Sequence, residues 1–496
     1  MADAEELPAA VAASILIIRA LRSPFPNPGQ VRMGTDGISF TLEGARRILL
    51  SRGSLKQITR GGHEMRRIGP GILPLLLLLS AALCFGVPAA EAQAKEQMFP
   101  LLCYRTGPYA PGGSGACGGW EDYMALLNTK NGVEGVTLRW EECETAYDTA
   151  RGIECYERHK PQMIVVDPLS TGITYALIER ATRDKIPIVS LGYGRADASI
   201  GGEIFPYVFP LVTNYWSQTS AKMRFIAQKE GGEDNLRGKK IALLYLDVPY
   251  GRETIPILEK LAERLGFEFR GFAVPPPGLE QGAQWVDIAR RFRADYVINR
   301  NWGVSCTVPL REAARVGFPR EKIIGVWWCG SEEDVRPAGD AAVGYIASNF
   351  HGVGTDFPMI QEIIEKVYGA GKGNLEKERV GTVYYNRGVV HGIVHTEALR
   401  TAIKKFGFPI TGEQFKWALE NLDITEARLQ EIGAANFMPP LKTSPDNHEG
   451  GGWVRFQQWD GQKWMAISDW VPPYKEIVSD EIKKSAEVYA KEKERK

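Results

Sequence analysis

The stretch KKIALLYLDVPYG, residues 239–251, is a continuous apolar run that ends in a short loop and leads into a helical segment. A strand that is apolar on both faces is typical of a parallel sheet covered by helices on both sides. Similar β-rich runs follow it, separated by stretches of helical composition: FEFRGFAV (267–274), ADYVINRNW (294–302), KIIGVWW (322–328) and VGYIASNF (343–350). The pattern predicts an α/β lobe with a doubly wound sheet.

A second set of β-rich runs lies upstream of residue 239. Its members are LLCYR (101–105), VTLRW (136–140), MIVVD (163–167) and IPIVSLG (186–192), and the alternation breaks at IFPYVFPLV (204–212). Each run is again followed by a stretch of helical composition. We therefore predict two doubly wound, Rossmann-like α/β lobes.

The pattern changes after Phe350 to long helical segments, at about 356–370, 380–406 and 411–420. Near the end of the chain, WVRFQQWDGQKWMAISDW (453–470) places the pair Asp460-Gly461 between alternating apolar positions. An Asp-Gly pair in this setting is a strong signal for a β-hairpin. A charged helix is predicted to close the chain.

The stretch MRRIGPGILPLLLLLSAALCFGVPAAEAQA, which begins at Met65, has the three-part pattern of a secretory signal peptide. Its apolar run is too short for a membrane-spanning helix, which needs about 20 apolar residues. We interpret 65–94 as the signal peptide, cleaved near Ala94 for export to the periplasm, and 1–64 as a spurious upstream extension. The alternative is that 1–64 form a genuine leader.

Cysteine usage agrees with export to an oxidising compartment, where disulfides are the default state of an even set of cysteines. No pair has the C-x-x-C spacing of a zinc site, which argues against metal binding. Removal of Cys84 with the signal peptide leaves six of the seven cysteines. Six cysteines allow 15 pairings, and proximity along the chain together with the strand positions favours three of them. The favoured pairs are Cys103 with Cys117, Cys143 with Cys155, and Cys306 with Cys329.

Composition and charge exclude some classes of partner. The chain has 60 Lys+Arg and 60 Asp+Glu, and its mean hydropathy is −0.21. Because no basic stripe is present, the sequence lacks the electrostatic footprint of a nucleic-acid-binding protein. The length that follows the signal is enough for two domains of ordinary size, each with a buried core.

The usual signatures of cofactors and catalysis are missing. The glycine-rich loop TGPYAPGGSGACGG (106–119) can face an anionic group, but it lacks both the G-K-[ST] ending of a phosphate loop and a dinucleotide fingerprint. No G-x-S-x-G elbow occurs. His391 and His395 have the spacing of a zinc pair without the glutamate of H-E-x-x-H, so we interpret them as packed or solvated helix residues. We predict no cofactor, no metal and no catalytic residue.

The loops after the predicted strands are the expected ligand site, because α/β sheets bind ligands at the carboxyl ends of their strands. Small, hydroxyl and aromatic residues dominate these loops: PLSTGIT (168–174), LGYGRADAS (191–199), DVPYG (247–251), NRNWGVS (299–305) and WWCGSEED (327–334).

The order of these loops, the GPYAPGG loop after the first strand, the YG that opens a helix after residue 246, and the terminal QQWDGQKW hairpin together resemble a known family. They are similar to the periplasmic substrate-binding proteins of ABC importers, in the branched-chain amino acid and amide branch with the type I fold. The resemblance covers about residues 96–475.

The resemblance implies two lobes joined by a hinge that the chain crosses three times, with the ligand enclosed as the lobes close. It assigns 95–211 plus 347–448 to lobe 1 and 212–346 plus 449–496 to lobe 2. It also implies a monomeric, non-enzymatic protein whose partners are a small-molecule ligand and the membrane permease of an ABC importer. Alternative interpretations are an extracytoplasmic sensor lobe of the same fold and a periplasmic enzyme.

Carried over residue by residue, the resemblance predicts a set of ligand contacts in the loops. The set consists of Tyr109, Ser170, Thr171, Gly172, Gly192, Tyr193, Gly194, Tyr250, Trp302 and Trp327.

Two positions depart from the amino-acid binders of this family. Arg195 follows Gly194 where those proteins carry a threonine, and Trp327 stands where they carry the acid that pairs with the ligand ammonium, unless Glu332 supplies it. A buried ammonium without a counter-charge is costly. We therefore predict an apolar or aromatic carboxylate as ligand, gripped by Arg195, with a branched-chain amino acid, amide or urea-like ligand as the alternative.

Overall fold

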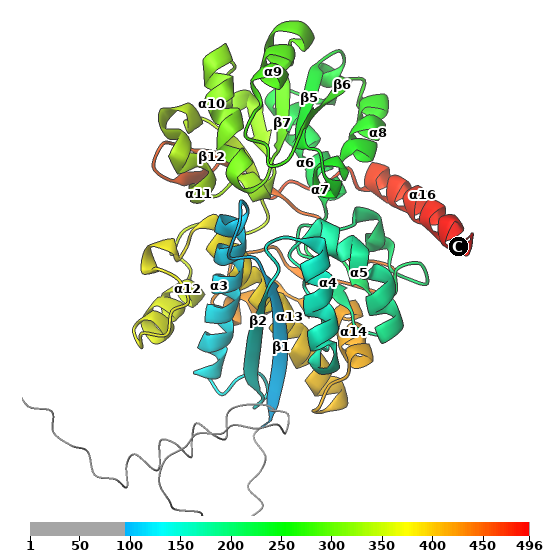
Figure 1. The fold of residues 1–496 in the computed structure, drawn as a ribbon, viewed down its shortest axis with the longest axis vertical. Helices are drawn as coiled ribbons and strands as arrows, with labels where there is room; N and C mark the ends of the chain where they lie inside the picture. The colour runs from blue at the N-terminus through cyan, green and yellow to red at the C-terminus, as the bar shows by residue number, and fades with distance from the viewer. Residues whose placement is uncertain (1–94, 496) are drawn as a thin grey trace, which may run out of the picture. The chain divides into compact units, whose positions relative to one another are not determined.

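The computed structural model describes residues 95–495. The predicted signal peptide at 65–94 and the upstream residues 1–64 lie outside this range. The described residues belong to one compact unit, in which two α/β lobes can be followed in Figure 1. No helix in the described part of the chain is long and apolar enough to cross a membrane.

Lobe 1 contains two pairs of parallel strands. These are β1 (Glu96–Cys103) with β2 (Thr137–Glu144), and β3 (Ile188–Val189) with β4 (Val208–Phe209). The helices of this lobe are α3 (Ala110–Asn128), α4 (Thr149–His159), α5 (Thr171–Asp184), α12 (Pro358–Ile363), α13 (Val383–Phe406), α14 (Gly412–Glu420) and α15 (Glu426–Glu431). A short antiparallel pair, β10 (Asp423–Ile424) with β11 (Leu441–Lys442), completes it.

The run MIVVD forms less of a strand than predicted, because only Val166 pairs, in a single bridge to Ile188. The next residue after Asp167 is Pro168, which has no N–H to offer a neighbouring strand, and Leu169 adopts a φ of 48°. The chain therefore turns out of the sheet directly after Asp167. The turn delivers Leu169 to the start of α5.

Lobe 2 is built on a seven-stranded sheet of order β13-β12-β9-β8-β7-β5-β6. The five strands from β6 to β9 are parallel and β12 and β13 are antiparallel. The strands are β5 (Lys240–Leu246), β6 (Glu268–Val274), β7 (Tyr296–Arg300), β8 (Ile323–Gly325), β9 (Ile346–Asn349), β12 (Arg455–Trp459) and β13 (Trp464–Ala466). The helices are α6 (Tyr215–Lys229), α7 (Pro249–Arg252), α8 (Ile255–Leu265), α9 (Gly282–Val286), α10 (Thr307–Val316) and α11 (Glu332–Val335).

The hairpin predicted from Asp460-Gly461 is present. Trp459 of β12 pairs with Trp464 of β13, and the Asp460 side chain accepts hydrogen bonds from the N–H groups of Gln462 (2.7 Å) and Lys463 (2.8 Å). Gly461 has a φ of 107°, a conformation that favours glycine. The charged C-terminal helix is also present, as α16 (Lys475–Glu494).

Sheet membership shows three crossings between the lobes, which confirms the predicted type I topology. The chain passes from β4 to α6, returns between β9 and α12, and crosses again between β11 and β12. β12 pairs with β9 and lies in the same lobe as β5 and β7 in Figure 1, although α12–α14 of the other lobe precede it in the sequence. The exact lobe boundaries stay a prediction.

Close packing of α3 on α13 forms the centre of lobe 1. The two helices approach through glycines: a Cβ on Gly119 would lie 2.0 Å from the Tyr385 carbonyl oxygen, and one on Gly388 would lie 1.9 Å from the Ala116 carbonyl oxygen. Only glycine fits such a contact. Part of the glycine-rich stretch singled out in the sequence, Gly115 and Gly119, therefore serves the packing of α3 on α13.

The three predicted disulfides are confirmed. Cys103 is bonded to Cys117, Cys143 to Cys155, and Cys306 to Cys329. Each joins the end of a strand, or the turn that follows one, to a nearby helix or turn. Two of the disulfides lie in lobe 1 and the third holds the loops that follow β7 and β8.

Candidate ligand-binding site

A small cavity lies where loops of the two lobes meet. Lobe 1 contributes residues that follow β1, β2 and β3 or begin α5, and lobe 2 contributes residues that begin α6 or follow β5, β7 and β8. These are the carboxyl ends of strands, where α/β sheets bind ligands. The lining residues are Tyr104, Tyr147, Leu169, Thr171, Tyr193, Tyr215, Tyr250, Trp302 and Trp328.

The wall of this cavity is aromatic and carries no charge. Tyrosine and tryptophan make up most of it, and none of its lining residues within the described chain is acidic or basic. The Trp302 ring lies 6.1 Å from that of Tyr104 across the lobes and 5.0 Å from that of Trp328 within lobe 2. Such a wall suits a flat or apolar group, because aromatic side chains offer large apolar area with defined orientation.

The free space is about 10 Å³, close to the smallest volume that holds one water molecule. The lobes touch at its rim, where the Val304 N–H donates to the Pro108 carbonyl oxygen at 2.9 Å. A ligand of several atoms therefore requires the lobes to move apart before it enters.

Four of the predicted contacts line the cavity: Thr171, Tyr193, Tyr250 and Trp302. A fifth, Tyr109, stacks on the Trp302 ring with centroids 6.1 Å apart and an interplanar angle of 8°. These residues come from five different loops, and the structure brings them to one place as the resemblance implied.

Four other predicted loop residues do not line the cavity but fix the conformation of the loops that do. The Ser170 side chain accepts a hydrogen bond from the Ile173 N–H and caps α5. Gly172 faces Thr149, whose Oγ1 would lie 3.2 Å from an added Cβ. Gly192 and Gly194 have φ values of 70° and 86° and make the turn that presents Tyr193.

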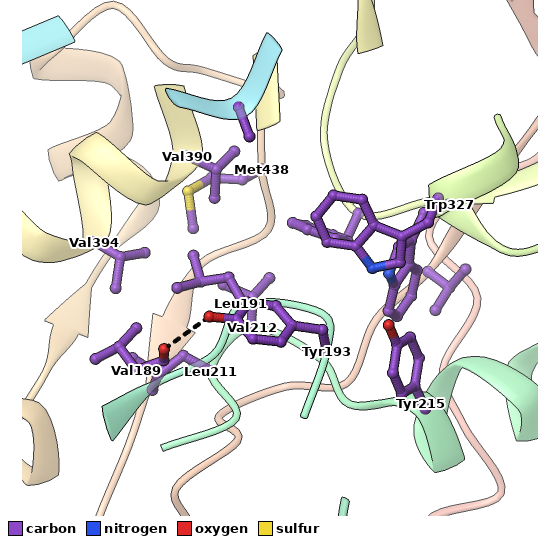
Figure 2. Close-up of a cluster of buried hydrophobic side chains, with 14 of the residues drawn as sticks. Val189, Leu191, Tyr193, Leu211, Val212, Tyr215, Trp327, Val390, Val394 and Met438 are labelled. Atoms are coloured by element: carbon purple, nitrogen blue, oxygen red, sulfur yellow. Dashed lines mark hydrogen bonds between the residues drawn. The ribbon is translucent and has the colours of Figure 1, made fainter. Parts of the chain in front are cut away.

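Trp327 does not line the cavity, and its neighbour Trp328 does. The Trp327 ring is fully buried, and its Nε1 donates to the Gly192 carbonyl oxygen at 2.6 Å. Figure 2 shows this ring lying against Tyr215, and the two centroids are 5.8 Å apart. Trp327 and Trp328 occupy one tight turn and both donate to the Gly192 carbonyl oxygen, yet only Trp328 lines the cavity, a difference that sequence alone does not resolve.

Arg195 also lies away from the cavity. Its guanidinium pairs with Asp197, at 2.6 Å from Nε to Oδ1, and lies 4.3 Å from the Tyr489 ring centroid on α16. Since both its charge and its flat face are occupied, the structure does not support its predicted role as the carboxylate partner. Glu332 likewise does not line the cavity, because its carboxylate accepts the Val383 N–H at 3.0 Å.

The sequence reasoning missed five lining residues: Tyr104, Tyr147, Leu169, Tyr215 and Trp328. Tyr104 was hidden inside LLCYR, which reads as a strand, although β1 ends one residue earlier at Cys103. Tyr215 follows the break in the α/β alternation rather than a recognised strand. A search for every aromatic residue near a strand end would have found most of the set.

Two buried arginines lie behind the aromatic wall. The Arg300 guanidinium carbon is 3.8 Å from the Tyr215 ring centroid, and that of Arg387 is 4.5 Å from the Trp328 ring centroid. Both side chains donate to backbone carbonyls, Arg300 to Tyr250 and Arg387 to Trp327. Neither forms an ion pair with a carboxylate of the described residues. Burial lowers the pKa of Arg387 to about 10, which leaves it charged at neutral pH.

Tyr193 is held by a buried network. Its hydroxyl bonds to the Asp167 carboxylate, receives the Leu169 N–H at 2.7 Å, and lies 3.2 Å from the Val189 carbonyl oxygen, the contact drawn in Figure 2. The His391 Nδ1 lies 2.6 Å from Asp167. Although burial raises the pKa of Asp167, the charge and hydrogen bond of His391 outweigh it and hold that pKa below its usual value. The His395 Nε2 lies 3.7 Å from the same carboxylate, so both HGIVH histidines belong to this network.

The fold and the aromatic site between the lobes define a solute-binding protein, and comparison with known families agrees. The chain belongs to the periplasmic binding protein family, whose profile matches residues 97–463. It is therefore an extracytoplasmic solute-binding protein of an ABC transporter.

Several crystal structures are similar to this chain. One, described as an ABC transporter permease from the Pseudomonas fluorescens group, is 45% identical with a TM-score of 0.76, over 81% of this chain and 98% of that one. A branched-chain amino acid ABC transporter protein from Thermus thermophilus with bound valine is 22% identical, with a TM-score of 0.64 over 78% and 98% of the two chains.

A third structure is an R. palustris solute-binding protein in complex with benzoate. It is 16% identical to this chain, with a TM-score of 0.59 over 76% of this chain and 97% of that one. No curated protein sequence matches the chain.

Proposed function

We propose that this protein delivers a small aromatic or apolar carboxylate to an ABC importer, enclosing it between the lobes as they close. The observation that carries the proposal is the cavity wall, which is lined by tyrosine and tryptophan and has no acidic side chain. An α-amino acid brings an ammonium group that needs a counter-charge when it is buried. The wall offers none.

Two buried carboxylates, one bonded to a wall residue and one to a residue packed on the wall, are already engaged. Asp167 is bonded to Tyr193 and His391, and Asp334 accepts the Tyr384 hydroxyl at 2.7 Å and the Ser331 N–H at 2.9 Å. Recruiting either for a ligand ammonium would break an existing buried hydrogen bond, which costs about 1–3 kcal/mol.

The electrostatic surroundings favour an anionic ligand group. Arg300 and Arg387 are buried behind the wall without carboxylate partners among the described residues. Thr171, which lines the cavity, is the first residue of α5, a helix of 14 residues. The amino end of such a helix carries a partial positive charge that stabilises anions.

Structural neighbours bind ligands of more than one class: benzoate and 4-hydroxybenzoate in two R. palustris proteins, and valine in the Thermus thermophilus protein. Their identities of 15–22% support the fold alone. The ligand class proposed here therefore rests on the wall itself, and the benzoates supply suitable probes.

The proposal also covers the export of the protein, its maturation and the delivery of its ligand. We infer that the chain is exported through the signal at 65–94, matures near Lys95, acts in the periplasm as a monomer without enzymatic activity, and hands its ligand to a membrane permease. The apolar run after Met65 supports export. N-terminal sequencing of exported protein tests it, and a mature chain that retains residues upstream of Met65 would contradict it.

Calorimetric titration tests the ligand class. The panel is benzoate, 4-hydroxybenzoate, 3-phenylpropanoate, octanoate, leucine and valine. We expect at least one of the carboxylates without an amino group to bind and the two amino acids to bind at least tenfold more weakly. Tight binding of leucine or valine with no response to the other acids would instead establish the branched-chain amino acid alternative.

A further inference from the structure

Four of the eight polar side chains in the cavity wall are already hydrogen-bonded within the protein. The Tyr250 hydroxyl donates to the Asn301 carbonyl oxygen at 2.8 Å, and the Trp328 Nε1 donates to that of Gly192 at 3.1 Å. The Thr171 Oγ1 accepts the Gly194 N–H at 3.3 Å. Together with Tyr193, these groups are fixed by partners other than a ligand.

Two donors in the same wall have no such partner. The Tyr104 hydroxyl and the Trp302 Nε1 make no hydrogen bond to any described residue, although the two residues are only 0% and 3% exposed. Leaving a buried donor unsatisfied is unfavourable, and native proteins rarely do so without a functional reason. Both residues line the cavity.

The two donors come from opposite lobes. Tyr104 directly follows β1 of lobe 1, and Trp302 follows β7 of lobe 2. Their rings lie edge to face, with centroids 6.1 Å apart and an interplanar angle of 80°. A ligand atom held by both would therefore bridge the lobes directly.

Trp302 is held in place by hydrogen bonds of its backbone and by ring stacking. Its backbone N–H donates to the Ser305 Oγ at 3.1 Å, and that hydroxyl donates back to the Trp302 carbonyl oxygen at 2.8 Å. Tyr109 of lobe 1 stacks on the indole ring. The position of Nε1 is thus set by the backbone hydrogen bonds with Ser305 and by the stacked Tyr109 ring.

The chemistry of the two groups defines what they bind. An indole N–H only donates, whereas a tyrosine hydroxyl can donate or accept. An acceptor with two lone-pair sites satisfies both, and an ammonium cannot bond to the indole at all. We propose that Tyr104 and Trp302 bind the ligand's carboxylate, one donor from each lobe, so that the anionic group itself holds the closed state. This inference rests on the proposed function and names the recognition atoms for it.

Matched pairs of variants separate these two donors from their neighbours in the wall. Tyr104→Phe and Trp302→Phe remove the unpartnered donors, while Tyr250→Phe and Trp328→Phe remove donors that the protein already uses. Nitrobenzene, which has the shape of benzoate without its charge, reports changes in packing. The measured quantity is the ratio of the affinities for benzoate and nitrobenzene.

We expect this ratio to fall about tenfold or more in Tyr104→Phe and in Trp302→Phe, because hydrogen bonds to charged groups are the strong ones. In Tyr250→Phe and Trp328→Phe the ratio stays at the wild-type value, whatever happens to both affinities together. A ratio that is unchanged in both test variants overturns the inference and leaves the proposed function standing. If none of the carboxylates of the panel binds the wild-type protein, the proposed function itself fails.

A second measurement needs no ligand. In the free protein, Tyr104→Phe removes an unsatisfied hydroxyl and should not lower the melting temperature, whereas Tyr250→Phe breaks an existing hydrogen bond and should lower it. Equal losses of melting temperature in the two variants would show that the Tyr104 hydroxyl already has a partner, and would overturn the inference.

Discussion

Gly112 shows how single residues control the approach of the lobes. It lies on α3 in lobe 1, and a Cβ added there would lie 2.2 Å from Cη2 of Trp302 in lobe 2. Nothing within lobe 1 lies nearer to this position than the indole ring. Because Gly112 has no side chain, it leaves room for the Trp302 ring when the lobes meet.

Gly112→Ala should therefore weaken ligand binding more than it weakens folding. Overpacking of this kind costs about 1–3 kcal/mol, and opening the lobes relieves it without unfolding either one. Calorimetry with the best ligand of the panel and thermal unfolding of the free protein measure the two effects. Gly282→Ala, whose nearest contact is 3.4 Å away, is the control. A lower melting temperature with unchanged affinity would contradict this role.

A second residue-scale effect concerns Glu332, which is 7% exposed and receives the Val383 N–H of the opposite lobe. Burial raises the pKa of Glu332 from 4.5 to about 7, although the hydrogen bond from Val383 lowers it in part. Its nearest charged neighbour is Glu333, which pairs with Arg379. The folded chain therefore keeps a proton at Glu332 between about pH 4.5 and 7 that the unfolded chain releases.

Because the folded state binds more protons in this window, the free energy of unfolding should fall as the pH rises from about 4.5 to 7. Glu332→Gln keeps an acceptor for the Val383 N–H but does not titrate. The difference between wild type and variant in urea unfolding should thus change by up to about 3 kcal/mol across the window. A difference that does not vary with pH would show that Glu332 is not perturbed.

The residue scale is also where the sequence is least informative. The order of the loops in the sequence was enough to predict Thr171, Tyr193, Tyr250 and Trp302 at the cavity. The strand ends converge in this fold independently of which side chains they carry. Which of two adjacent tryptophans faces the cavity depends on the turn at Trp327–Cys329, a tertiary feature. The pairing of Arg195 with Asp197 depends in the same way on the fold around it.

At the scale of elements, the disulfides constrain loops that carry or adjoin cavity residues. Cys143 at the end of β2 is bonded to Cys155 in α4, and the segment between them carries Tyr147 of the cavity wall. The sequence predicted this bond because a strand end and the next helix lie close together. Strand lengths were harder to predict, as MIVVD shows, because pairing depends on the neighbouring strand as well as on apolar content.

Removing this bond should lower stability. Cys143→Ser with Cys155→Ser opens a loop with a sequence separation of 12, which by chain entropy costs about 3 kcal/mol. Urea unfolding measures the loss. Peptide mapping under non-reducing conditions is the check on the wild type, and free thiols at both positions would contradict the bond itself.

At the scale of the whole molecule, the two lobes are tied by polar contacts outside the aromatic cavity. Glu332 accepts the Val383 N–H, and Glu253 accepts the Ala196 N–H at 2.8 Å. The cavity itself is aromatic and uncharged. Closure thus joins a polar rim to an apolar centre, an arrangement that encloses an apolar ligand away from water.

The measurement that tests this account most directly compares 3-phenylpropanoate with phenylalanine, which differ only by the α-amino group. The wall has no acidic side chain to pair an ammonium, and an unpaired buried charge costs more than the 1–3 kcal/mol typical of a neutral group. We predict that 3-phenylpropanoate binds at least tenfold more tightly in calorimetric titration. Equal or tighter binding of phenylalanine would contradict the central claim that the cavity selects carboxylates without an amino group.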